Sequence, residues 1–219
     1  MGRNRISYLL FVVVAVFFIP ACAKSNPLPK ETTSDDISIS PIITDAAKME
    51  NTVSAAPEEK ITDIVNKLPK FDVTSSSLRE DGKWLSVITN TEAGENKSPQ
   101  LSWSPVKNAN YYAIYMFDTS AGDWLHWIAK DLTVTELELG AKLDNSQYIG
   151  PYPPSGTHTY EITVYALSEK PDSYGGAFDA PNYNMDKIIN RLNTSDGKPG
   201  NILAKGVISG TYTYGDIVE

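Results

Sequence analysis

From Lys70 onward the chain consists of short apolar stretches of β type, separated by Gly, Asn, Asp and Pro. Turn-forming residues at such close intervals leave room for strands but not for the helices that link parallel strands. The pattern therefore predicts a mainly β fold, an antiparallel β-sandwich. The expected strands cover residues 111–117, 124–130, 133–139, 158–167 and 201–209.

Two segments have helical spacing instead. Ile61, Ile64, Val65 and Leu68 recur at three- and four-residue intervals, which predicts a short amphipathic helix within residues 58–68 that packs on the edge of the domain. The spacing of Met185, Ile188, Ile189 and Leu192 predicts a second helix, for which Asn184 or Asn182 would be the N-cap. The main domain is expected to span residues 69–219.

The first residues are typical of a secretory signal, predicted here for residues 1–21. Two arginines precede an apolar stretch from Ile6 to Ile19, which is shorter than the roughly 20 residues that a membrane-spanning helix needs. Residues 19–22 (IPAC) resemble the lipobox of bacterial lipoproteins, although Pro20 departs from that pattern. The resemblance implies a lipid anchor at Cys22 and a place in the cell envelope, facing the periplasm or the exterior. An ordinary signal peptide with an incidental cysteine is the alternative.

Composition limits the function of the exported part. Residues 22–57 are rich in Ser, Thr, Asp, Ala and Pro and are expected to be a flexible acidic tether. Cys22 is the only cysteine, so the domain would have to be stable without a disulfide. The net charge of −8 becomes −10 if residues 1–21, with their two arginines and no acid, are removed. Such a charge argues against nucleic acid as a partner and against a polybasic contact with anionic lipid.

The tract 150–160 (GPYPPSGTHTY) is the strongest candidate for a binding site. Its prolines and glycines predict a stiff loop that leads into a strand. Alternation along that strand would place His158 and Tyr160 on the same face as Ile162 and Val164. Alternation likewise predicts that Trp124, His126 and Ile128 share one face of the strand 124–130, so two histidines would each lie beside apolar side chains.

Several tracts, in the same order, resemble the phosphatidylethanolamine-binding protein (PEBP) family, in its bacterial branch. They are the opening strand and turn in residues 71–82, the N-x-S-P-x-L-S-W signature in residues 96–103, the first acid of a D-P-D motif at Asp118, a His-Trp pair at 126–127, and G-P-x-P-P-x-G-x-H-x-Y in residues 150–160. Thr119 and Ser120 stand where the D-P-D motif has Pro and Asp.

The resemblance implies a β-sandwich of Greek-key type with a few peripheral helices and a small pocket at one end. By position the pocket residues would be Asp118, His126, Pro153, Pro154, His158 and Tyr160. Such a pocket would bind a phosphate-type or carboxylate anion, such as a phospholipid headgroup or a phosphorylated small molecule. Imidazole and phenol groups would donate hydrogen bonds to it, and a nearby carboxylate would raise the pKa values of the histidines. We therefore expect anion affinity to fall as pH rises.

No motif indicates an enzyme. The chain has no G-x-S-x-G elbow, no phosphate-binding Gly-Lys-Ser/Thr loop, no H-E-x-x-H and no cysteine free for catalysis, and no cofactor or metal is expected. A non-catalytic binding protein is the preferred interpretation. Two alternatives remain: an interaction or inhibitor module that grips a partner protein through the pocket rim at residues 119–123, and an uncharacterised hydrolase that uses Asp118 with a histidine.

Overall fold

The computed structural model describes residues 59–219. The predicted signal peptide, Cys22 and the tether lie outside the described residues. The helices are α1 (Ile61–Asn66) and α2 (Met185–Leu192), with one 3-10 turn at Ser86–Ile88. The strands are β1 (Val73–Thr74), β2 (Leu101–Trp103), β3 (Tyr111–Asp118), β4 (Trp124–Leu132), β5 (Glu136–Leu137), β6 (Ser146–Tyr148), β7 (Thr157–Leu167), β8 (Thr194–Ser195), β9 (Lys198–Pro199) and β10 (Ile202–Thr213).

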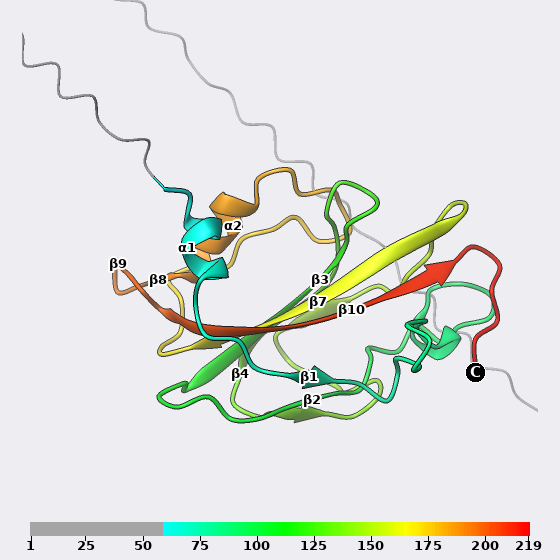
Figure 1. The fold of residues 1–219 in the computed structure, drawn as a ribbon, viewed down its shortest axis with the longest axis horizontal. Coiled ribbons are helices and arrows are strands. Elements are labelled where there is room, and N and C mark those ends of the chain that lie inside the picture. The colour runs from blue at the N-terminus through cyan, green and yellow to red at the C-terminus, as the bar shows by residue number, and fades with distance from the viewer. Residues whose placement is uncertain (1–58) are drawn as a thin grey trace, which may run out of the picture. The chain divides into compact units, whose positions relative to one another are not determined.

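Three layers make up the described fold. The central layer is a five-stranded sheet in the order β10-β7-β3-β4-β6, and every pairing in it is antiparallel. A smaller sheet, β1-β2-β5, covers one face of it, while α1 and α2 cover part of the other (Figure 1). The mainly β fold with a few peripheral helices is therefore confirmed.

Alternation along β7 divides the core in two. Tyr160, Ile162 and Val164 point into the cluster under the small sheet, as the sequence predicts. Tyr165 and Leu167 point into the cluster under the helices. Because both faces of this strand are covered over much of its length, a slip of one residue would exchange the two sets, so the register is strongly fixed.

The element boundaries follow the sequence prediction with one clear exception. The strand expected at 133–139 is reduced to Glu136–Leu137, because its partner β2 is only three residues long; beyond the two paired residues, the Trp103 amide donates to the Thr135 carbonyl. Helix α1 occupies Ile61–Asn66, inside the stretch with helical spacing. The side chain of Asn184 accepts a hydrogen bond from the Lys187 amide and is the N-cap of α2.

A β-bulge in β4 corrects one sequence expectation. Met116 pairs with Trp127 but Phe117 pairs with Leu125, so His126 is an extra residue in the ladder. The alternation restarts after it: Trp127 packs under the small sheet and Ile128 under the helices. The prediction that Ile128 shares a face with His126 is therefore wrong. His126 lies instead beside Tyr160, with ring centroids 5.3 Å apart.

Gly210 leaves room for the side chains of Leu78 and Trp84 against the central sheet. It pairs with Tyr160 across the β7–β10 ladder. A Cβ atom at Gly210 would lie 2.3 Å from Leu78 Cδ1 and 2.9 Å from Trp84 Nε1. The buried Trp84 indole donates a hydrogen bond of 3.3 Å to the carbonyl of Tyr160. Gly210 thus makes room for a side chain that fixes the backbone at Tyr160.

We expect Gly210→Ala to destabilise the protein by about 1–3 kcal/mol, the usual cost of overpacking a tight core. Urea unfolding of the full chain measures the change. Ser209→Ala, at the exposed neighbouring position, is the matched control and should change stability little. Equal stability of Gly210→Ala and the wild type would contradict the close approach of Trp84.

Candidate functional site

A cavity of about 250 Å³ opens where β3, β4 and β7 meet the loop that contains Pro153 and Pro154. All six residues predicted for the pocket line it: Asp118, His126, Pro153, Pro154, His158 and Tyr160. Ala121, Trp124 and Tyr152 complete the lining. The structure therefore brings together side chains that are up to 42 positions apart in the sequence, as between Asp118 and Tyr160.

Asp118 is buried at the end of β3, and both of its carboxylate oxygens are occupied. One oxygen accepts the Ser120 amide at 2.9 Å, which forms the turn after the strand. The other lies 2.6 Å from Nδ1 of His158. Asp118 therefore acts both as a turn acid and as the partner of a histidine, two roles that the sequence could not separate.

His158 and Tyr160 reach the cavity from the start of β7. When Nδ1 of His158 donates to Asp118, Nε2 of the ring remains for a ligand. The Tyr160 hydroxyl is buried and forms no hydrogen bond with any described residue. Burial and the negative charge of Asp118 raise the pKa of Tyr160, so its hydroxyl keeps its proton and is available as a donor.

His126 differs from the sequence expectation in its charge. Its ring is buried, and Nδ1 lies 2.9 Å from the Ile149 carbonyl, to which it must donate because a carbonyl only accepts. Burial lowers the pKa of His126, and this effect outweighs the hydrogen bond to Ile149 and the charge of Asp118, which raise it. The carboxylate of Asp118 thus acts on His126 in the expected direction, but burial makes the net shift of the His126 pKa downward.

Asp179 holds two walls of the cavity in place, and nothing in the sequence indicated this. Its Oδ1 accepts hydrogen bonds from the Tyr152 hydroxyl at 2.5 Å and from the Trp124 indole at 3.0 Å. Burial, followed by the contact with Asp179, raises the pKa of Tyr152 to about 12. The Tyr152 ring meets His126 edge-on, with centroids 5.3 Å apart.

The proline loop is anchored by Asn96, the first residue of the N-x-S-P signature. The Asn96 side chain accepts a hydrogen bond of 2.7 Å from the Gly150 amide, and its own backbone has φ of 53°. A Cβ atom at Gly150 would lie 2.0 Å from the Ile88 carbonyl oxygen. Asn96 and Gly150 are therefore needed for the geometry of the loop and not for contact with a ligand.

Thr119 and Ser120 replace the Pro and Asp of the family motif without loosening the rim. The Thr119 amide donates to the Thr159 carbonyl at 3.0 Å, and Ser120 Oγ accepts the Thr159 amide at 2.9 Å.

Within residues 59–219 no group of three or more His, Cys, Asp or Glu side chains is arranged to hold a metal ion.

The lowered pKa of His126 has a measurable consequence. At pH values between the lowered pKa of His126 and the unperturbed value of about 6.5, the unfolded chain binds more protons than the folded chain. The stability of the protein should therefore rise with pH across that range and fall on acidification. Unfolding of the full chain by urea, followed at several pH values in a phosphate-free buffer, measures this. His126→Asn keeps a donor for the Ile149 carbonyl and should have a smaller slope. The same slope in both proteins would show that His126 is not the cause.

Comparisons with known proteins agree with this geometry. The family model described as phosphatidylethanolamine-binding protein matches residues 75–213. A UPF0098 protein of Methanothermobacter thermautotrophicus is 30% identical over 142 residues, which cover 56% of this chain and 86% of that protein.

Two solved structures are similar to this chain. A putative phosphatidylethanolamine-binding protein homologue from Chlamydia trachomatis matches with a TM-score of 0.52 and 22% identity over 65% of this chain and 97% of that one. YbcL of E. coli matches with a TM-score of 0.49 and 21% identity over 65% of this chain and 98% of that one. Since the family model covers well over half of the sequence, this chain belongs to the phosphatidylethanolamine-binding protein family.

Proposed function

We propose that the cavity at the end of β7 binds a phosphate-type or carboxylate anion and does not transform it. The observation that carries the proposal is the Tyr160 hydroxyl, which is buried against the cavity without a hydrogen-bond partner among the described residues. Leaving a buried donor unbonded costs about 1–3 kcal/mol, which an anion oxygen accepting from Tyr160 would restore.

The two histidines present different hydrogen-bonding groups to the cavity. Nδ1 of His158 lies 2.6 Å from Asp118, so the protonated ring can donate from Nε2 to an anion while it donates from Nδ1 to Asp118. Nε2 of His126 is the remaining nitrogen of a ring that burial keeps neutral, and in that state it accepts a hydrogen bond. A monoprotonated phosphate monoester supplies both kinds of oxygen, an acceptor for His158 and Tyr160 and a hydroxyl for His126.

A binding role is favoured over hydrolysis because the cavity contains no activated nucleophile. Its lining residues are an acid, two histidines, aromatic rings, prolines and an alanine, and the acid already has both oxygens occupied. The tyrosine that faces the cavity has a raised pKa and stays protonated. These groups can orient an anion, whereas hydrolysis would depend on a water molecule activated by the His158–Asp118 pair.

Calorimetric titration of the full chain with phosphate, phosphoethanolamine and phosphoserine tests the proposal. We expect saturable binding that weakens as pH rises, with proton uptake on binding, because an anion favours the charged form of an imidazole that donates a hydrogen bond to it. Tyr160→Phe, which removes only the hydroxyl, should weaken binding about tenfold. Tyr183→Phe, at a residue that is 85% exposed, is the matched control and should leave affinity unchanged.

Other outcomes would select the alternatives. Absence of binding by all three anions to a folded protein would disprove the anion site and favour an interaction module at residues 119–123. Release of phosphate or alcohol from the bound ester, lost in Asp118→Asn, would show a hydrolase. An affinity that stays constant from acid to mildly alkaline pH would exclude the histidines as the source of anion selectivity.

We also propose that the chain is exported and held at the membrane by lipid on Cys22. The support is the sequence of residues 1–22. No helix in the described part of the chain has the length and apolar character needed to cross a bilayer. In cells fed labelled palmitate, the wild type should carry label and sediment with membranes. Cys22→Ser should do neither, while Ser25→Ala, three residues on, is the control. Equal labelling of Cys22→Ser would disprove the anchor.

A further inference from the structure

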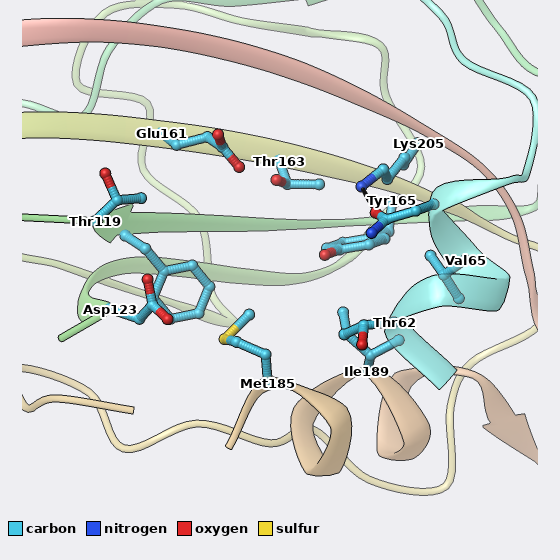
Figure 2. Close-up of a pocket in the computed structure, with 12 residues that line it drawn as sticks. Thr62, Val65, Thr119, Asp123, Glu161, Thr163, Tyr165, Met185, Ile189 and Lys205 are labelled. Atoms are coloured by element: carbon cyan, nitrogen blue, oxygen red, sulfur yellow. Dashed lines mark hydrogen bonds between the residues drawn. The ribbon is translucent and has the colours of Figure 1, made fainter. Parts of the chain in front are cut away.

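A second cavity, of about 200 Å³, lies on the opposite face of the central sheet, between β3, β7, β10 and the two helices (Figure 2). It is separate from the anion pocket because Tyr160 faces the small sheet whereas Phe117 and Tyr165 face the helices. Its volume is below the roughly 300–1,000 Å³ of sites for drug-sized ligands, so its occupant would be a small molecule.

Opposite charges line this cavity without neutralising each other. Glu161 on β7 and Lys205 on β10 both face it, yet they form no ion pair. Lys205 pairs with Tyr165 across the ladder, four residues along β7 from Glu161, so the two backbone positions are about 13 Å apart at about 3.3 Å per residue. The Glu161 carboxylate accepts no hydrogen bond from any described residue. The strand register therefore keeps the carboxylate of Glu161 and the ammonium group of Lys205 apart.

Lys205 has only part of its hydrogen-bonding capacity in use. Its ammonium group donates to Asn66 Oδ1 of α1 at 2.5 Å, which leaves two of its three protons without a hydrogen bond to the described chain. Burial is the main cause that lowers the pKa of Lys205, and it is only partly offset by the distant Glu161. An anionic group placed beside this ammonium would stabilise its charged form.

The other end of the cavity is acidic. Figure 2 shows Glu161 and Asp123 toward one end and Lys205 toward the other, with Met185 between them along the wall. No side-chain hydrogen bond or ion pair from a described residue reaches the Asp123 carboxylate, and burial raises its pKa. A cation placed there would favour the ionised form of Asp123.

The wall between the two ends suits a short aliphatic chain. Met185 and Ile189 of α2 form its apolar side, and Phe117 closes it from β3. The hydroxyls of Thr163 and Tyr165 face the same cavity, and no backbone group of the described chain hydrogen-bonds to either one.

We propose that this cavity binds a small linear zwitterion of the ω-amino acid class. Its ammonium group would lie at Glu161 and Asp123, its carboxylate at Lys205, and its methylene chain along Met185 and Ile189. A ligand with both charges satisfies both ends of the cavity, whereas an amine or a carboxylic acid leaves one end unpaired. This site does not depend on the anion pocket or on its proposed function.

Titration of the full chain with 6-aminohexanoate, hexylamine and hexanoate tests the proposal. The zwitterion should bind at least about tenfold more tightly than either ligand with a single charge, as expected for one added charge-assisted hydrogen bond. In Glu161→Gln, which keeps the shape of the side chain, 6-aminohexanoate should bind no better than hexanoate. Glycine and 4-aminobutyrate, with shorter spacers, should bind more weakly than 6-aminohexanoate.

Control variants separate the site from a general loss of structure. Lys205→Met should lose the preference for the zwitterion over hexylamine, and Lys205→Arg should keep it. Glu80→Gln and Lys107→Met change the same residue types at exposed positions and should have no effect. His158→Ala should leave the binding intact, which distinguishes this cavity from the anion pocket. Equal affinity for the three six-carbon ligands, or an unchanged affinity in Glu161→Gln, would overturn the proposal.

Discussion

The ladder between β3 and β7 is the constraint on which the rest of the structure depends. It runs without a register shift from the pair Tyr111–Leu167 to the pair Asp118–Tyr160. Its last pair places a carboxylate directly opposite the tyrosine that forms the wall of the pocket, and the same strand carries His158 within hydrogen-bonding distance of that carboxylate. No long-range loop has to be positioned to bring these groups together. Strand pairing therefore holds these three side chains in place before a ligand binds, which lowers the entropy lost on binding.

The site contains buried polar groups. Some of them have hydrogen-bond partners within the protein that offset the cost of burial, and others do not. Both carboxylate oxygens of Asp118 are bonded within the protein, and Oδ1 of Asp179 accepts two hydrogen bonds. Tyr160 is left unbonded, although the carbonyl of the same residue is held by the Trp84 indole. A site whose buried donors and acceptors were all hydrogen-bonded within the protein would gain no hydrogen bond from a ligand. Among the groups that line the cavity, the unpartnered hydroxyl of Tyr160 is thus the one whose free energy a ligand can change most.

The sequence was sufficient for the central sheet, because alternation along a strand is a local signal, and for the residues of the pocket, because several tracts resemble those of the family. It was not sufficient for the charge state of His126, which depends on how deeply the bulge in β4 buries the ring and on a carbonyl 23 residues away. An extra residue in a strand has no signature in a single sequence, so the expected position of Ile128 was wrong for the same reason. Asp179 was missed because its two partners meet only after the loops have packed. The second cavity was also missed, since its charges belong to strands whose register is set elsewhere.

Consecutive residues of β7 face chemically different surroundings. Tyr160 and Glu161 are neighbours in the chain, yet the first faces the cavity beside Asp118 and the second faces the helices. Their partners across the ladder, Asp118 and Phe117, alternate in the same way. The hydrogen-bonded backbone between the faces holds both side chains at fixed positions. A central strand of this sheet can therefore support two polar sites only one residue apart in sequence, provided that the register is fixed by apolar packing elsewhere along the strand, as it is at Ile162 and Leu167.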